Sequence, residues 1–519
     1  MAEEHIVYVD GNTLTPSEVV MVAEGSAKVE VSPDAWPGIH ASRAVVERIV
    51  ANDETVYGIN TGFGALVNQR ISSDDLAQLQ VNLIRSHATA IGPLMSAREV
   101  RAMMVIRLNS LCKGHSGIHP NCINQLALYL NSNLHPAVPR IGSLGASGDL
   151  APLSHLALGL IGEGQLVTAE GELRATGEVL FEMGILPVEL TAKDGLSLIN
   201  GTSQMSAYAV LSHQRLKHLL PLADVILCTS MEARKCSVRP SYELVHKARP
   251  HPGQTLVAER IRAILKDSPI VESHLDCDRV QDAYSFRCAP QVHGAVLESF
   301  HRFDDMINIE LNSATDNPLI FPTPHEPGAH EVVSQGNFHG EILALTADAV
   351  SLAIFELGSI SERRIDQMVD PARSQLPAFL AQNSGLESGL MIVQYVAGAS
   401  LSELRGHASP RSAFSTSTSA GQEDHVSMGA TATWNMYQAT ERLSEVLACE
   451  AMVACQALEF EPLSPAPHVS GFYKLIRTVI APLEGDRSTS DELRKLSHVL
   501  LEGSWLARIE SEFGRLPSR

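Results

Sequence analysis

A stretch of small residues from Gly142 to Leu153 (GSLGASGDLAPL) holds groups that could react with one another. Because glycine lacks a Cβ, the Gly148 amide nitrogen could approach the Ala146 carbonyl carbon and close a backbone ring. Loss of water from that ring and from the Ser147 side chain would leave a methylidene group conjugated to a carbonyl. No encoded side chain supplies such an electrophile. Taken alone, the stretch also fits an ordinary helix start, with Ser147 or Asp149 as the N-cap.

Six further motifs accompany this stretch in a fixed order along the chain. They are Tyr57–Gly64 (YGINTGFG), Leu198–Thr202 (LINGT), Gln281–Arg287 (QDAYSFR), Glu310–Pro318 (ELNSATDNP), Gly336–His339 (GNFH) and Gln422–His425 (QEDH). The ordered set resembles the motifs of the aromatic amino-acid ammonia-lyase and aminomutase family, in which Ala-Ser-Gly forms a methylidene-imidazolone prosthetic group. The resemblance implies a mainly α-helical homotetramer whose active sites each combine loops from three subunits. It also implies a small amino-acid substrate, with no pyridoxal phosphate and no required metal.

The implied reaction makes two chemical demands on the site. Ammonia loss from an α-amino acid breaks a C–H bond at the weakly acidic β-carbon and expels an amine, which is a poor leaving group. One base and one amine-activating electrophile are therefore required. Ala146, Ser147 and Gly148 would form the electrophile, and Tyr57 would be the base. A phenol has an ordinary pKa of about 10, so nearby positive charge or helix N-termini would have to lower the pKa of Tyr57.

Five other residues have roles toward the substrate and the prosthetic group. Arg287 would bind the substrate carboxylate, because a planar guanidinium makes two parallel charge-assisted hydrogen bonds. By resemblance, neutral donors and acceptors from Asn200, Gln281 and Tyr284 surround the prosthetic group, the carboxylate and the amine. Phe338 would pack against the prosthetic ring or the substrate. Each residue alone would more often be a structural ion pair, a satisfied loop residue or a core aromatic.

Three residues bear on which side chain the substrate carries. His87 matches a position that contacts the substrate ring, but resembling sequences that share it act on histidine or on tyrosine. Met391 and Glu423 resemble the histidine-acting branch. A carboxylate gains a charge-assisted bond from an imidazole, whereas beside an unsubstituted phenyl ring it would be buried without a partner. We therefore expect elimination of ammonia from L-histidine to give trans-urocanate.

Alternatives to this expectation stay open. A phenol hydroxyl could also donate to Glu423 or His87, so a tyrosine or other aryl-alanine ammonia-lyase, or a 2,3-aminomutase, is the runner-up. Glu423 also fits a helix-start carboxylate paired with arginine or histidine. A non-catalytic helical oligomer is disfavoured, because Tyr57, the Ala-Ser-Gly string, Asn200 and Arg287 are all present.

The elements that must position these residues are mostly helices. Helix formers dominate 205–235, 290–312, 340–368 and 430–460, and a helical pattern from Asp74 to Cys112 breaks near Gly92. Between 340 and 360 one apolar stripe runs through 342, 345, 349 and 352, and another through 343, 350, 354 and 357, so we expect burial among other helices. The Ser/Thr-rich stretch 409–419 predicts a mobile loop.

These patterns predict a mainly α fold, a bundle of long helices with a loop-rich N-terminal part. Residues 1–205 would carry the tyrosine and prosthetic-group loops, and 206–519 the bundle and C-terminal helices.

Composition narrows the function classes. The 519 residues contain 39 Lys and Arg against 59 Asp and Glu, a net charge of −20, which argues against nucleic-acid binding. The eight cysteines include no Cys-x-x-Cys pair and predict reduced, mostly buried thiols. The N-terminus begins with acidic residues and no uncharged apolar run reaches about 18 residues. We expect a cytoplasmic protein that does not bind a membrane.

Overall fold

The computed structural model describes residues 5–56, 58–61, 71–72, 75–275, 279–323 and 330–519. The chain forms two compact units, each assembled from separate segments. Unit 1 comprises 1–211, 304–347 and 410–434, and unit 2 comprises 212–303, 348–409 and 435–519. The division after residue 205 that the sequence suggests stays a prediction.

Unit 1 is built of helices and very small sheets. Its first helices and strands are β1 (His5–Val9), α1 (Pro16–Ala23), β2 (Ala27–Val31), η1 (Pro33–Ala35), α2 (Trp36–Ala51), α3 (Leu76–His87), β3 (Ile91–Leu94), α4 (Ala97–Cys112) and α5 (Pro120–Asn131). Strands β1 and β2 pair in parallel. Helix α4 is buried from Glu99 to Cys112, which makes it the central helix of this unit. The predicted break near Gly92 holds a short strand, β3, where Gly92 has φ +88° and Pro93 cannot donate a helical hydrogen bond.

The remaining elements of unit 1 surround the Gly-rich segment. They are β4 (His135–Pro136), β5 (Pro139–Ile141), α6 (Leu150–Leu160), β6 (Gln165–Val167), β7 (Leu173–Ala175), α7 (Thr176–Met183), α8 (Asp194–Ile199), β8 (Leu319–Pro322), β9 (His330–Val333) and η6 (Ser419–Gly421). Strand β5 pairs antiparallel with β3, β6 pairs with both β4 and β7, and β8 pairs with β9. These short pairings leave much of the unit as loops, as the sequence predicted.

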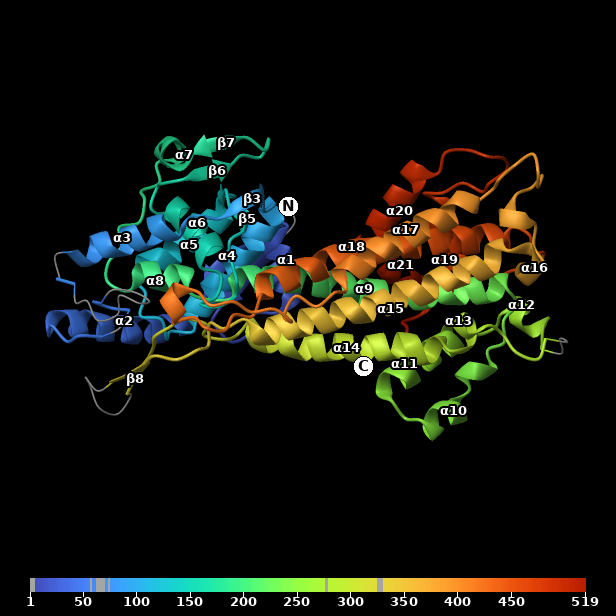
Figure 1. Ribbon diagram of the computed structural model, residues 1–519, viewed down its shortest axis with the longest axis horizontal. Helices are drawn as coiled ribbons and strands as arrows, with labels where there is room; N and C mark the ends of the chain where they lie inside the picture. Colours follow the sequence, from blue (N-terminus) through green and yellow to red (C-terminus); the bar gives the residue numbers. More distant parts are fainter. Residues whose placement is uncertain (1–4, 57, 62–70, 73–74, 276–278, 324–329) are drawn as a thin grey trace. The chain divides into compact units, whose positions relative to one another are not determined.

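The long helices confirm the mainly α prediction. They are α9 (Ser203–Ala233), α14 (Ala289–Glu310), α15 (Glu341–Val369) and α18 (Gly429–Leu458), close to the expected ranges. Within unit 2 they lie side by side (Figure 1). Buried polar contacts join them, since Asp224 of α9 bonds to His293 of α14 at 2.8 Å and Arg364 of α15 pairs with Glu450 of α18 at 2.5 Å.

Shorter helices complete unit 2. They are η4 (Arg239–Ser241), α10 (Glu243–Ala248), α11 (Pro252–Ile264), α12 (Pro269–Glu272), α13 (Tyr284–Arg287), α16 (Pro371–Ser374), η5 (Ala378–Leu380), α17 (Met391–His407), α19 (Pro467–Arg477), α20 (Ser490–Glu502) and α21 (Ser504–Phe513). Of the eight cysteines, the seven in the described part of the chain are free thiols, and six of these are buried. The prediction of reduced, mostly buried thiols is confirmed for these seven.

Helix α15 departs from the expected burial on all sides. Its second stripe is buried, with Leu343, Val350, Ile354 and Leu357 all at most 2% exposed. The first stripe faces outward, and Ile342, Leu345 and Leu352 are each more than half exposed. Within the described ranges, α15 is the one helix long and apolar enough to cross a membrane, and half of its most apolar window is buried inside the protein.

Candidate active site

The Ala-Ser-Gly loop is held in a tight turn against a second loop. Gly145 and Gly148 have φ of +66° and +73°. A methyl group on Gly148 would collide with the Gly201 carbonyl group, so only glycine fits there. Gly148 and Gly201 form a β-bridge, and the Asp149 amide donates to the Gly201 carbonyl at 2.7 Å. The turn that could cyclise is therefore packed directly on the Asn200–Gly201 backbone.

Asp149 stands at the N-cap position of α6, as the helix-start interpretation expects, but its side chain does not cap that helix. The carboxylate accepts instead from the amides of Gln204 and Met205, at 2.8 and 3.0 Å, and from the Ser143 hydroxyl at 2.7 Å. Complete burial raises the pKa of Asp149 to about 6, although these hydrogen bonds oppose the rise. Asp149 thus joins the loop to the start of α9, a role that the sequence analysis missed.

Two of the predicted site residues converge on Ser147. The Asn200 amide donates to the Ser147 carbonyl oxygen at 2.7 Å, and the Ser147 hydroxyl donates to the Glu423 carboxylate. The three residues come from segments more than 50 positions apart in the sequence. Their meeting supports the grouping that the motifs suggested.

Two residues of the Ser/Thr-rich stretch before Glu423 bond to the segment that follows them. The amide and hydroxyl of Thr418 donate to the backbone and side chain of Glu423 at 2.8 and 2.7 Å, and the Ser415 hydroxyl accepts from the Val426 amide at 2.9 Å. These local bonds of hydroxyls close a turn, and the mobility of 409–419 stays a prediction. Thr418 is the second residue that the sequence analysis missed, and its place five residues before the carboxylate was the available signal.

The segments after Glu423 and before α15 both bond to the Gly-rich loop. Met428 donates its amide to the Leu144 carbonyl, and the amide of Gly340 donates to the Gly145 carbonyl at 3.0 Å. Half-buried Phe338 therefore stands two residues from a direct contact with the loop.

His87 ends α3, is half-buried, and its Nδ1 lies 2.8 Å from the Leu83 carbonyl oxygen.

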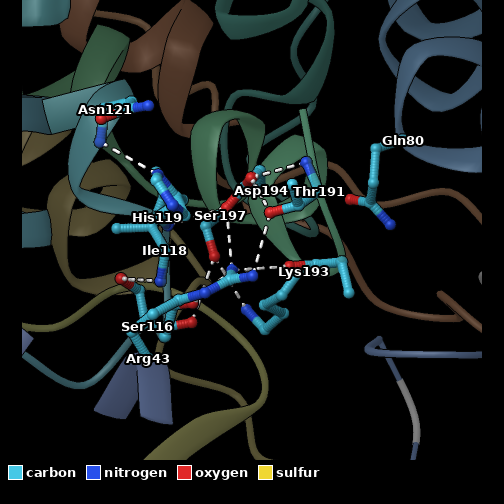
Figure 2. Close-up of polar contacts among 12 residues, drawn as sticks. Arg43, Gln80, Ser116, Ile118, His119, Asn121, Thr191, Lys193, Asp194 and Ser197 are labelled. Atoms are coloured by element: carbon cyan, nitrogen blue, oxygen red, sulfur yellow. Dashed lines mark hydrogen bonds and ion pairs between the residues drawn. The ribbon is translucent and has the colours of Figure 1, made fainter. Parts of the chain in front are cut away.

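Asn200 follows α8, whose start is fixed by a buried polar cluster (Figure 2). Asp194, fully buried, accepts from the His119 amide at 2.8 Å and from the amide and hydroxyl of Thr191, both at 2.7 Å. Arg43 pairs with the same carboxylate at 3.3 Å and also donates to the Thr191 hydroxyl. Asn200 directly follows this six-residue helix, so the cluster that holds the start of α8 lies within two turns of the Asn200 side chain.

Four predicted residues lie in unit 2. Tyr284 and Arg287 stand at the two ends of α13, where the Arg287 guanidinium lies 4.6 Å from the centre of the Tyr284 ring. Tyr284 is 70% exposed, Gln281 is exposed, and Met391 is the first residue of α17.

In the described ranges the contact found for the Arg287 guanidinium is the Tyr284 ring and not an acid, so the structural ion-pair interpretation of this residue finds no support there. The Ser285 carbonyl within α13 accepts from buried Arg364 at 3.4 Å, which anchors the helix. Tyr57, the predicted base, lies outside the described residues.

A comparison with known proteins decides the family. The model of the family "Aromatic amino acid lyase" matches residues 14–478, most of the chain. The chain belongs to the aromatic amino acid lyase family. Family membership confirms the resemblance found in the motifs, and it makes the chain a carbon–nitrogen lyase.

Relatives within the family cover almost the whole chain. A histidine ammonia-lyase of Myxococcus xanthus is 44% identical over 506 residues, which are 97% of this chain and 98% of that protein. The crystal structure of histidine ammonia-lyase from Trypanosoma cruzi superposes with a TM-score of 0.89 at 40% identity, covering 98% of this chain and 95% of that one. Tyrosine aminomutase from Streptomyces globisporus gives a TM-score of 0.91 at 36% identity, covering 98% of each chain. The fold is thus shared by family members with different substrates.

Proposed function

We propose that this enzyme is a histidine ammonia-lyase, which converts L-histidine to trans-urocanate and ammonia. The observation that carries the proposal is the carboxylate of Glu423, held by Thr418 and bonded to the Ser147 side chain. A carboxylate aimed at the electrophile's loop suits a substrate with a hydrogen-bonding, chargeable imidazole better than one with a phenyl ring. Relatives named histidine ammonia-lyase, 44% and 40% identical over nearly the full chain, agree with this choice.

The proposed prosthetic group is a methylidene-imidazolone formed from Ala146, Ser147 and Gly148, with no pyridoxal phosphate and no required metal. The residues fit this group in two ways. The turn leaves no room for a Cβ at Gly148, and Asn200 donates to the Ser147 carbonyl, the oxygen that would stay conjugated to the methylidene. When formed, the group supplies an electrophile that takes up the substrate amine and turns it into a better leaving group.

The chain's own residues would then bind the substrate and move its proton. Asn200 withdraws electron density from the conjugated carbonyl by donating a hydrogen bond. Glu423 orients the imidazole, with His87 and Met391 beside the ring. Arg287 binds the carboxylate, since its guanidinium lies against the Tyr284 ring and has no acidic partner in the part of the chain that the structure describes.

The remaining roles complete the proposed site. Gln281 and Tyr284 supply neutral donors and acceptors, and Phe338 packs against the ring. Tyr57 removes the β-proton.

We also propose a cytoplasmic homotetramer with active sites shared between subunits. The exposed apolar side chains of Ile342, Leu345 and Leu352 lie along one face of α15, and subunit interfaces commonly cover such a face. Helix α17 adds Ile392 and Tyr395, which are 59% and 66% exposed.

The runner-up is a tyrosine ammonia-lyase or 2,3-aminomutase. A tyrosine aminomutase is 36% identical over 98% of this chain, and a phenol could also donate to Glu423. The deciding experiment incubates the purified enzyme in parallel with histidine, tyrosine and phenylalanine and separates the products. We expect urocanate from histidine. Coumarate or β-tyrosine, with histidine left unchanged, would overturn the proposal in favour of the runner-up.

A further inference from the structure

Lys193 combines two features that are each unfavourable. Its side chain is completely buried, and burial lowers its pKa although Asp316 opposes the change. Its backbone has φ +74°, a left-handed conformation that residues with a Cβ seldom adopt. A residue that is both buried and strained persists only where its surroundings compensate. The contacts of its ammonium group show what that compensation holds in place.

The Lys193 ammonium group joins two separate segments of unit 1. Its Nζ pairs with Asp316 Oδ2 at 2.8 Å, across 123 positions of sequence. It also donates to the Ser197 hydroxyl at 3.2 Å, which donates in turn to the Ser116 carbonyl (Figure 2). The other Asp316 carboxylate oxygen accepts from the Asn317 amide at 2.7 Å. The ion pair therefore ties the start of α8 to the turn that precedes β8.

The two segments that the ion pair joins also flank Gly58, through Leu196 and Pro318. We call the space between these two side chains the Gly58 slot. Leu196 follows Lys193 by three residues, and Pro318 follows Asp316 by two. A Cβ built on Gly58 would stand 2.7 Å from Pro318 Cδ and 3.0 Å from Leu196 Cδ2. Gly58 itself has φ +76°. The backbone at Gly58 thus fits between Pro318 and Leu196, and the ion pair joins the two segments that carry these side chains.

We propose that Lys193 and Asp316 are positioning residues that hold the Gly58 turn, and with it the attachment point of Tyr57. This inference rests on the proposed function, in which Tyr57 removes the β-proton. The turn at Asp316 and Asn317 also supports the segment that leads to Phe338. Gln335 donates its side chain to the Asp316 carbonyl at 2.6 Å and its amide to the Asn317 side chain at 2.8 Å.

The test replaces Lys193 by methionine, which keeps most of the volume but removes the charge. The matched control is Arg101→Met, which removes another buried cation of unit 1. Arg101 bonds to the Val22 and Leu130 carbonyls, not to the Gly58 slot. Three measurements are made on each full-length enzyme: intact mass, hydrogen exchange of residues 56–61, and kcat and KM for L-histidine.

We expect Lys193→Met to speed exchange in 56–61 by at least about tenfold, because Ile59 and Asn60 both donate to the Val56 carbonyl within this turn. We expect kcat to fall by about 10²-fold, the scale of a 1 Å misplacement, while KM stays within about threefold. The mass should still show the loss of two waters, because the Ala-Ser-Gly loop is held by other contacts. Arg101→Met should change neither the exchange in 56–61 nor kcat.

A second variant guards against misfolding of Lys193→Met. In Gly58→Ala the added methyl group would collide with Leu196 and Pro318, while the ion pair stays in place. This variant should therefore give the same loss of kcat and the same faster exchange. Equal exchange in Lys193→Met and Arg101→Met would overturn the positioning role, as would a matching loss of kcat in both. If wild-type enzyme consumes tyrosine rather than histidine, the proposed function fails, whereas the exchange result still decides this inference.

Discussion

The Glu423 carboxylate is the residue that, in our proposal, selects the substrate. Glu423→Gln keeps the side chain's shape but removes its charge, so kcat/KM for histidine should fall by about 10²-fold or more, the scale for loss of one preorganised polar contact. Tyrosine and phenylalanine should be affected less. Steady-state kinetics with the three amino acids measures this.

Glu423→Ala provides the matching control. It should cost histidine turnover at least as much as Glu423→Gln, while any trace of phenylalanine activity should hold or rise because an unpartnered carboxylate has left the pocket. Equal losses for all three substrates would show that Glu423 supports the loop rather than selecting the ring.

Ser147 would be the source of the methylidene carbon, so its hydroxyl is needed before any substrate binds. Ser147→Ala should fold normally, keep the full sequence mass and lose nearly all activity. Wild-type enzyme should be lighter than its sequence by two waters and should be inactivated by borohydride. Intact mass spectrometry checks this, with Ser154→Ala as the control, since the Ser154 hydroxyl donates to the Leu150 carbonyl of its own helix, α6. A full, unmodified mass in active wild-type enzyme would contradict a self-made electrophile.

At the scale of helices, Glu232 near the end of α9 joins two neighbouring elements of unit 2. Its carboxylate accepts from the Ala466 amide, which precedes α19, at 2.8 Å, and from the Ser268 hydroxyl at the start of α12. Burial raises its pKa from 4.5 to about 7. The protonated form therefore stabilises the fold, and that contribution is complete below about pH 4.5 and lost as pH rises through about 7.

The pH dependence of stability follows from this shift. We expect the free energy of unfolding to fall by at most about 1.4 kcal/mol per pH unit from this group between pH 4.5 and 7. Asp149, whose pKa is raised to about 6, adds a change of the same sign. Glu232→Gln should flatten part of this slope and be more stable than wild type at pH 8. Thermal unfolding at fixed protein concentration from pH 5 to 8 measures the effect, and identical slopes in both proteins would contradict it.

For the whole molecule, the exposed α15 stripe predicts assembly. Leu345→Asp places a charge in the middle of that stripe and should dissociate the tetramer and abolish activity, because burying an unpaired carboxylate in an interface is costly. Sedimentation velocity with activity assays on the separated species is the measurement. Arg494→Glu, at an exposed position of α20, is the control and should leave the assembly intact. An active wild-type monomer would refute the shared-site tetramer.

Mixing two inactive variants gives a second test of active sites shared between subunits. Inactive Tyr57→Phe and Arg287→Ala variants should regain some activity together if the two residues come from different subunits of one site.

Local patterns in the sequence determined most of the fold and the chemistry proposed for the site. The four long helices begin and end close to the predicted residues because apolar periodicity and helix propensity act within a few turns of chain. The Ala-Ser-Gly string, Asn200, Arg287 and Glu423 were identifiable because their motifs are contiguous.

Only the tertiary structure decided which groups meet. Both α15 stripes are apolar, so which one the chain buries depends on neighbouring helices. The pairing of Lys193 with Asp316, 123 residues away, leaves no trace in local periodicity, because a buried lysine looks like a surface one until its partner is placed beside it. Thr418 and Asp149 likewise take their roles from the backbone groups that folding brings within hydrogen-bond distance. Spacing along the chain carries information about elements, whereas the contacts that aim a catalytic group depend on distances in space that only the packed core sets.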